Sequence, residues 1–252
     1  MSKAKVNDLI DNEKFEHHFQ ALYDLETLSP IGYEALLRTK LFKNPEILFE
    51  QASLTDRFFE LEIRSIKKIL QAFDDLIGGL TDKRKLLMNV FPSNLIRDEF
   101  ITYLDQYMAN KKFKPQQVII EITESDVMNN VTSLMRNVYL LREKGYLIAI
   151  DDVGKGVSSL QAIVELRPDF VKMDRYFANQ LANSNRKQEM VRSIVTYCLH
   201  TNTKFVLEGI EIMEDLEMAK SIGVNIVQGF LLAEPQPLQT IKCIESRMAD
   251  GF

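Results

Sequence analysis

FEHHFQALYDLE, residues 15–26, and IGYEALLRTK, residues 31–40, are the two segments that decide the fold. Both have the apolar and aromatic content that is typical of β-strands. Only a short polar turn around Ser29 and Pro30 separates them, and such a turn is too short for the helix that connects two parallel strands. We therefore expect the two segments to pair as an antiparallel hairpin, with one strand running against the rest of the sheet.

The rest of the chain alternates helical stretches with short apolar runs. Apolar residues three or four positions apart predict amphipathic helices over 56–77 and 130–145, and Gly145 is a typical helix stop. The apolar runs between helices are typical of parallel strands covered on both faces. These runs lie at 85–91, 117–124, 146–152, 169–175, 204–210 and 225–233.

Together these elements predict an α/β fold. A TIM-type (β/α)8 barrel with one antiparallel strand near the N-terminus accounts for eight strands of which six alternate with helices. An open doubly wound sheet is the alternative. No Pro-, Gly- or Ser-rich linker and no internal repeat interrupts residues 1–252, so we expect a single domain.

The composition excludes several kinds of partner. The formal net charge of -5 gives no broad electrostatic reason to bind a DNA or RNA duplex. No apolar run reaches the roughly 18 residues of a membrane span, and the start has no signal-peptide core. We therefore expect a cytoplasmic protein without a membrane partner. Cys198 and Cys243 lack metal-ligand spacing, and we expect both to be reduced and buried.

One charged pair lies inside the second predicted strand. Glu34, Leu36 and Arg38 share a face, because side chains alternate along a strand. If that face is buried, the acid and the base need each other, a metal ion or a charged ligand.

Polar residues recur at or near the C-terminal ends of the later strands. One such residue is often a solvated edge or a helix cap, but capping does not explain acids in strand after strand. Active sites of (β/α)8 barrels are built from these strand ends. The set comprises Glu34, Arg38, Asn89, Glu121, Asp151, Asp152, Lys172, Asp174, Glu208 and Gln228.

The chemistry of this set favours a hard metal ion. Carboxylates and one Asn dominate, and none of the three histidines belongs to the set. Oxygen ligands without imidazole or thiolate suit Mg²⁺ or Mn²⁺. Facing carboxylates repel one another unless cations are bound, so we expect two divalent ions. Lys172 is expected to stabilise charge on a phosphate; the alternative is a lysine with a buried stem and a head that reaches solvent.

Taken in order, the motifs resemble the EAL-domain family of bacterial cyclic di-GMP phosphodiesterases over about residues 15–237. YEALLR carries the triplet that names the family. It is followed by LLMNVFPSNL, IIEITES, IAIDDVGKGVSSL, FVKMDRYF, FVLEGIE and VQGFLLAEPQP.

The resemblance implies a role for each site residue. The metal ligands would be Glu34, Asn89, Glu121, Asp151 and, at a second ion, Asp152. Lys172 would contact the catalytic water, and Glu208 would be an essential acid, either metal-linked or the general base. The residues expected to bind the substrate are Gln20, Leu37, Arg38 and Gln228, with Arg38 pairing with a phosphate. Glu124 would steady the loop after Asp152, whereas Asp174 and Glu211 match motif positions without a defined role.

The implied reaction is hydrolysis of one phosphodiester bond of cyclic di-GMP to linear pGpG. Family members often dimerise near the loop after the fifth strand, so we expect a homodimer; control by an unidentified regulatory protein is left open. That loop departs from the family pattern, because Val153, Lys155 and Val157 replace Phe, Thr and Tyr. The departures leave the activity and the dimerisation open.

Three other functions compete with this one. A receptor that binds cyclic di-GMP without cutting it would be favoured by loss of an acid or the lysine, and none is lost. A retaining glycosidase would place Glu121 and Glu208 about 5 to 5.5 Å apart. It would leave Asp151, Asp152 and Lys172 without a task, in a chain that has no Trp for a sugar platform. A metal-dependent phosphodiesterase acting on another ester is the third alternative.

Overall fold

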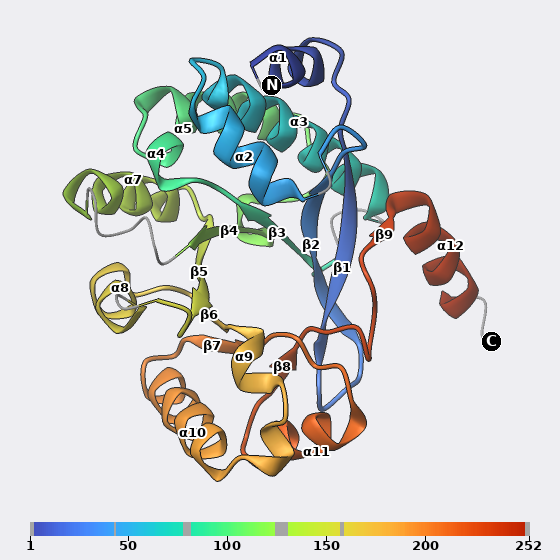
Figure 1. Cartoon of the computed structure of the whole chain (residues 1–252), viewed down its shortest axis with the longest axis vertical. Helices are drawn as coiled ribbons and strands as arrows, with labels where there is room; N and C mark the ends of the chain where they lie inside the picture. The colour runs from blue at the N-terminus through green and yellow to red at the C-terminus, as the bar shows by residue number, and fades with distance from the viewer. Residues whose placement is uncertain (1–2, 43, 78–81, 124–130, 157–158, 250–252) are drawn as a thin grey trace.

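The computed structural model describes residues 3–42, 44–77, 82–123, 131–156 and 159–249. Within this part of the chain, eight strands form a ring that is surrounded by helices (Figure 1). The strand order is β2-β3-β4-β5-β6-β7-β8-β1, and β1 also pairs with β2, which closes the ring. The predicted TIM-type barrel is therefore confirmed, and an open sheet is excluded.

The hairpin supplies the reversed strand of the barrel. β1 (Glu16–Asp24) and β2 (Pro30–Arg38) pair antiparallel, with Gln20 opposite Glu34. β1 is also antiparallel to β8 (Ile226–Val227), whereas the other neighbours in the ring are parallel. These parallel strands are β3 (Lys85–Asn89), β4 (Val118–Thr123), β5 (Leu147–Val153), β6 (Phe170–Met173) and β7 (Lys204–Leu207). A short strand, β9 (Gln236–Pro237), adds to β1 from outside the ring.

Two predicted amphipathic helices cover the sheet as expected. In α3 (Phe58–Leu76) the apolar stripe that includes Ile66 and Phe73 is buried, and in α7 (Val131–Glu143) Leu134 and Val138 are buried. Gly145 follows α7 with φ +93, a backbone conformation that favours glycine. The remaining helices are α1 (Lys3–Asp11), α2 (Pro45–Ser53), α4 (Pro92–Leu95), α5 (Asp98–Met108), α8 (Ser159–Leu166), α9 (Arg175–Ala178), α10 (Asn185–His200), α11 (Met213–Ser221) and α12 (Leu238–Ala249), with 3-10 turns η1 (Pro115–Gln117) and η2 (Leu181–Asn183).

The interior of the barrel contains an apolar layer below a polar one. The apolar layer consists of Leu22, Leu87, Ile119, Ala149, Phe170, Val206 and Ile226. On the six strands from β3 to β8, the residue two positions further on is polar: Asn89, Glu121, Asp151, Lys172, Glu208 and Gln228. Residues two apart on a strand share a face and lie roughly 6 to 7 Å apart, so the polar residues form a layer one step nearer the C-terminal mouth.

The hairpin strands β1 and β2 contribute to the same two layers, but with a different order or type of residue. Because β1 runs backwards, its polar Gln20 precedes the apolar Leu22 by two residues. On β2 the polar Glu34 follows Gly32, at which a Cβ atom would lie 2.4 Å from the backbone oxygen of Lys85. The close approach of β2 and β3 thus requires glycine at that level, and the neighbouring strands fill the apolar layer.

Two local expectations are wrong. The last strand was expected over 225–233, but only Ile226–Val227 joins the sheet. The chain turns after Val227, and Ile210 satisfies part of the backbone there by donating to Gln228 O and accepting from Leu231 N. Cys198 is buried as expected, whereas Cys243 is exposed. Among the described helices, none combines the length and the apolar character needed to cross a bilayer.

Candidate functional site

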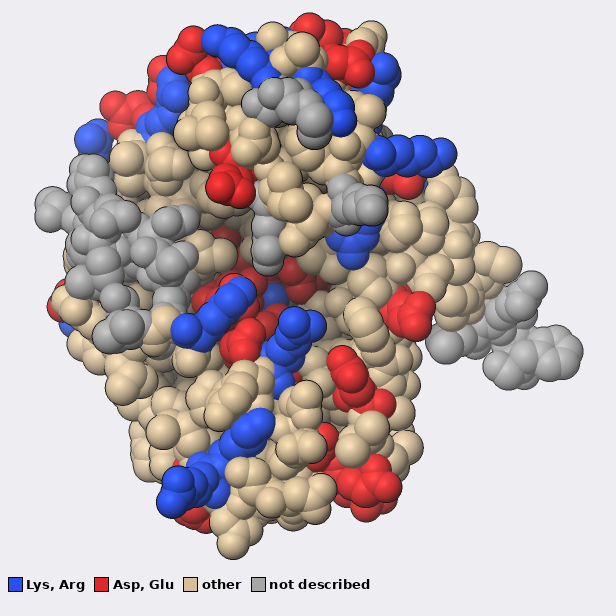
Figure 2. Space-filling view, in the orientation of Figure 1, with Lys and Arg blue, Asp and Glu red and all other residues tan. Residues whose placement is uncertain are grey.

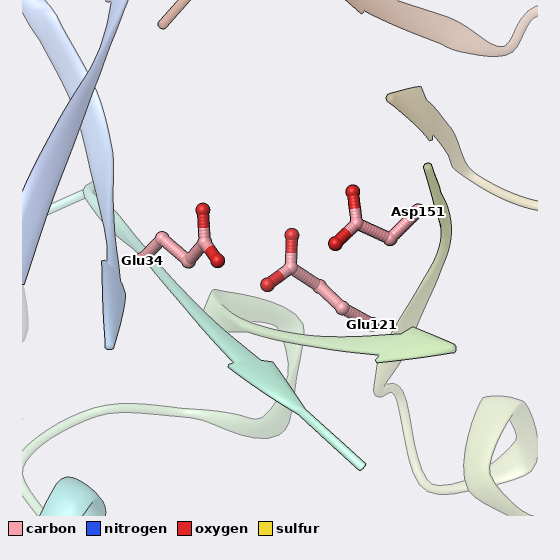
Figure 3. A group of neighbouring side chains, drawn as sticks. All are labelled: Glu34, Glu121 and Asp151. Atoms are coloured by element: carbon pink, nitrogen blue, oxygen red, sulfur yellow. The ribbon is translucent and has the colours of Figure 1, made fainter. Parts of the chain in front are cut away.

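Three carboxylates converge at the C-terminal mouth of the barrel. Glu34 on β2, Glu121 on β4 and Asp151 on β5 point toward a common point (Figure 3) and each offers a carboxylate oxygen within 4.8 Å of the others. Asn89 on β3 joins them, because its Nδ2 donates to Glu34 Oε1 at 3.1 Å. The four residues expected as ligands of the first metal ion are therefore brought together. Figure 2 shows acidic side chains in a hollow on this face, with basic side chains near its edge.

Lys172 occupies the centre of the acidic cluster. Its Nζ lies 2.7 Å from Glu121 Oε1 and 2.8 Å from Glu208 Oε1. The same Nζ is 3.2 Å from an oxygen of Glu34 and 3.2 Å from one of Asp151. The lysine side chain is fully buried, so the alternative of a head that reaches solvent is wrong. One ammonium group thus faces four carboxylates, and their charge exceeds what it neutralises.

Burial and crowding shift the titration of the acids. Desolvation raises the pKa of Glu121 and of Glu208 well above the ordinary value, and nearby carboxylates, Glu34 and Asp151 respectively, raise it further. Desolvation also raises the pKa of Asp151. At Glu34 burial acts in the same direction, but Lys172 and the hydrogen bond from Gln228 outweigh it and lower the pKa. Burial disfavours the charge of Lys172, yet the carboxylates, Asp151 first, raise its pKa well above the usual value.

The residues present fit a hard divalent cation. The donors are carboxylate and amide oxygens, which Mg²⁺ and Mn²⁺ prefer. Glu121 Oε2 is buried and has no hydrogen-bond partner among the described residues, although buried polar atoms normally have one. The grouping of four acids around one ammonium and this unpartnered oxygen both favour an additional cation.

Asp152 lies beside the cluster. β5 has an irregular register between Ile150 and Val153, and Asp152 has a left-handed backbone with φ 58. A bulge lets two consecutive residues turn toward the same side of the sheet, so Asp151 and Asp152 line one pocket of about 330 Å³. The carboxylate of Asp152 pairs with Lys155 Nζ at 3.1 Å.

The residues expected on the substrate side divide into two groups. Gln228 Nε2 donates to Glu34 Oε2 at 2.8 Å and to Gln20 Oε1 at 3.1 Å, so both glutamines belong to the polar layer. Arg38 and Leu37 line the 330 Å³ pocket. The Leu37 side chain also packs in an apolar cluster with residues of α1 and α2. Arg38 Nη1 donates to Leu37 O at 3.0 Å.

Two expected positions lie outside the polar layer. Asp174 caps α9, because its carboxylate accepts from Tyr176 N at 2.9 Å. Glu211 is exposed beyond the end of β7. Glu124 lies outside the described residues. The set of polar residues predicted at strand ends therefore contained one residue, Asp174, that caps a helix and does not face the barrel interior.

Sequence reasoning missed a buried acid that supports the cluster. Glu62 on α3 is 3% exposed, and its Oε1 accepts from Phe91 N at 2.8 Å. Phe91 follows Asn89 by two residues, so Glu62 anchors the chain as it leaves β3. A glutamate on the apolar face of an amphipathic helix was the available signal, since Glu62 lies one turn from Ile66.

The comparisons with known proteins confirm the family resemblance seen in the sequence. The EAL domain model matches residues 3–235. The cyclic di-GMP phosphodiesterase RocR of Pseudomonas aeruginosa is 28% identical over 248 residues, covering 94% of this chain and 62% of RocR. The bifunctional diguanylate cyclase/cyclic di-GMP phosphodiesterase MucR of the same species is 35% identical over 230 residues, covering 87% of this chain and 33% of MucR.

A solved structure has the same fold. The manganese and cyclic di-GMP complex of Klebsiella pneumoniae BlrP1 superposes with a TM-score of 0.81 at 26% identity, over 88% of this chain and 56% of that one. The chain therefore spans less than two thirds of RocR, MucR or BlrP1.

Proposed function

Because this chain belongs to the EAL domain family, we propose that it is a metal-dependent phosphodiesterase that hydrolyses cyclic di-GMP to linear pGpG. The observation that carries the proposal is the convergence of Glu34, Glu121, Asp151 and Glu208 on Lys172 at the barrel mouth. The names of RocR and MucR, and the manganese and cyclic di-GMP in the BlrP1 complex, support it.

The oxygen-rich end of the site would hold the metal. Glu34, Asn89, Glu121 and Asp151 would bind one Mg²⁺ or Mn²⁺, and Asp152 would contribute to a second. Divalent ions bound there would stabilise charge on phosphate oxygens and lower the pKa of water. To bind metal, these carboxylates would have to be in their ionised form.

Glu208 and Lys172 would handle the proton and the charge. Burial keeps the pKa of Glu208 well above the ordinary carboxyl value, which suits a group that takes the proton of the attacking water. Lys172 lies 2.8 Å from Glu208 and would offset negative charge as it develops on the phosphate. Glu34, Glu121, Asp151 and Glu208 hold the Lys172 ammonium beside the oxygens that would bind the metal.

Arg38 and the two glutamines would position the substrate. Arg38 lines the pocket beside the acids, and a guanidinium binds a phosphate through paired hydrogen bonds. Gln228 holds Glu34 through its Nε2, and its Oε1 has no partner among the described residues, which leaves an acceptor for a water molecule or the substrate. Gln20 orients Gln228 by accepting from the same amide nitrogen.

A second candidate is a receptor that binds cyclic di-GMP without cutting it. The observation that favours it is the contact between Lys155 and Asp152, because an ammonium group 3.1 Å from that carboxylate competes with a second metal ion. Both candidates share the same binding site, so they differ only in whether product forms.

A product assay distinguishes them. Purified protein is incubated with cyclic di-GMP and Mg²⁺ or Mn²⁺, and pGpG is separated by anion-exchange chromatography. We expect pGpG that disappears on chelation, and a loss of roughly 10² to 10⁴ in kcat for Glu208→Gln. Glu34→Ala should remove turnover while circular dichroism shows a retained fold. Tight binding of cyclic di-GMP without pGpG would establish the receptor instead.

A further inference from the structure

The pocket next to the acids extends well beyond them. Its lining includes Asn89, Asp151 and Asp152 of the acidic site, and also His17 on β1 and Ser65 on α3. Its volume of about 330 Å³ is near the lower limit for small-molecule sites, roughly 300 to 1,000 Å³. A pocket of this size suits one nucleotide half of a cyclic dinucleotide rather than the whole molecule.

The lining of this pocket includes a buried polar pair. His17 alternates with the inward-facing His18 and Gln20 along β1, so it points outward, and its Nε2 lies 2.8 Å from Ser65 Oγ. His17 is only 8% exposed. Within the described part of the chain, the other ring nitrogen, Nδ1, makes no hydrogen bond. Nδ1 is not among the fully enclosed side-chain atoms that lack a partner, so it remains open to a hydrogen bond with a ligand in the pocket.

The charge of this pair favours a nucleobase over a phosphate. Burial, with help from Lys68 and Arg38, lowers the pKa of His17 to about 3, so the ring is neutral at physiological pH. A neutral imidazole has one donor and one acceptor, and a serine hydroxyl can donate or accept. Nδ1 is therefore available in either role, and base edges carry both donors and acceptors.

An aromatic pair lines the same pocket. Phe49 and Phe91 both line the pocket, and their ring centroids are 4.9 Å apart. Aromatic side chains stack against bases whatever their sequence. The pocket thus offers an apolar face, a polar edge at His17 and a cation at Arg38, which correspond to the base plane, the base edge and the phosphate of one nucleotide.

We propose that His17, with Ser65 behind it, hydrogen-bonds one guanine base of the substrate and that Phe49 and Phe91 form the wall against which this base lies. The inference rests on the proposed function and deepens it, because it assigns one half of cyclic di-GMP to this pocket. His17 and Ser65 are then substrate-binding residues that take no part in the hydrolysis itself.

Calorimetric binding of cyclic di-GMP tests the inference without turnover. The titration uses Ca²⁺, at a concentration at which chromatography detects no pGpG. His17→Leu replaces the ring by an apolar side chain, and Ser65→Ala removes the hydroxyl behind it. We expect the Kd to rise about 10-fold for His17→Leu and about 3-fold for Ser65→Ala, as for loss of a hydrogen bond. His200→Leu, at an exposed position on α10, should bind like wild type.

Nitrogen NMR on the wild type gives a second readout that needs no destabilising substitution. The chain has three histidines, so ¹⁵N-histidine labelling gives few ring signals, which His18→Gln and His200→Leu help to assign. We expect the His17 Nδ1 resonance to shift when cyclic di-GMP is added with Ca²⁺ and to stay in place with Ca²⁺ alone. A merely structural His17 would not respond to the nucleotide.

The outcomes separate this inference from the proposed function. If wild type binds cyclic di-GMP but His17→Leu binds within two-fold of it and the His17 resonance does not move, the inference alone is overturned. If wild type binds no cyclic di-GMP, the proposed function and the inference are both lost.

Discussion

At the scale of single residues, the site depends on one ammonium group among acids. Lys172 is fully buried and lies within 3.2 Å of oxygens from Glu34, Glu121, Asp151 and Glu208. Removing one partner from a buried ionic cluster leaves charge without compensation, which is far more costly than losing an exposed pair. Lys172 therefore stabilises the metal-free protein as well as serving the proposed chemistry.

We expect Lys172→Met to lower the free energy of unfolding by about 3 kcal/mol in EDTA, because the buried acids lose their nearest cation. Mn²⁺ should restore part of this loss. Urea unfolding with and without Mn²⁺ measures both effects, and Lys112→Met at an exposed position is the control. Equal unfolding midpoints for Lys172→Met and wild type in EDTA would contradict the expectation.

The buried carboxyl group of Glu62 should make the stability of the protein depend on pH. Burial raises its pKa from the ordinary value of 4.5 to about 8, so between these values the folded protein holds a proton that the unfolded chain has released. Stability therefore falls as the pH rises through this range, and the loss is complete above pH 8. Glu62→Gln keeps an acceptor for Phe91 N but cannot ionise, so it should escape this loss.

We expect Glu62→Gln to match wild type near pH 5 and to be more stable by roughly 1 to 3 kcal/mol at pH 9. Urea unfolding at the two pH values, in EDTA, gives the difference. Glu143→Gln, at an exposed position on α7, should show no such divergence. A constant difference between Glu62→Gln and wild type across the range would show that Glu62 does not hold the proton.

At the scale of elements, the irregular end of β5 decides how two consecutive acids are used. Asp151 faces the cluster, whereas Asp152 has a left-handed backbone and pairs with Lys155 at 3.1 Å. The side chain of Lys155 is 60% exposed, and an exposed ion pair is worth about 0 to 1 kcal/mol. Lys155 thus modulates Asp152 and does not block it.

We expect Lys155→Thr to strengthen binding of the weaker Mn²⁺ ion by about two- to five-fold, because Asp152 loses a competing cation. Calorimetry with Mn²⁺ measures this effect independently of activity. Lys144→Thr is a matched control, since Lys144 forms an exposed pair with Asp105 at 2.8 Å. Unchanged Mn²⁺ binding in Lys155→Thr would remove Lys155 from the metal site.

At the scale of the whole molecule, large apolar side chains are exposed on the neighbouring helices α7 and α8. The two helices pack together beside β5, and Tyr139, Leu160 and Val164 are 63%, 66% and 58% exposed. Grouped large apolar side chains on a surface often mark an interface. The loop that precedes α8 is the one near which the expected homodimer would form, so this surface is our candidate for its interface.

We expect Leu160→Glu to shift the protein toward the monomer, because a buried charge opposes association. Light scattering after size-exclusion chromatography, over a range of concentrations, measures the mass. Leu54→Glu is the control, since Leu54 is 77% exposed and lies before α3. A monomeric wild type, or a dimer that survives Leu160→Glu, would rule out this interface.

The sequence by itself indicated the alternating strands and helices, the reversed strand and the oxygen-rich chemistry of the site, and it favoured a closed barrel over an open sheet. These features depend on local rules: a short turn enforces antiparallel pairing, and alternation of side chains places polar residues of successive strands on one face. Glu34, Asn89, Glu121 and Asp151 could be picked out because each interrupts or ends an apolar run.

Only the tertiary structure decided which polar residues meet. Lys172 and Glu34 are 138 positions apart, and their contact depends on closure of the ring, which no local pattern encodes. The structure also showed that β6 ends at Met173, so that Asp174 caps α9 instead of joining the cluster. The contact between His17 and Ser65 depends on the packing of α3 on β1, which is set by the shapes of whole elements rather than by either residue.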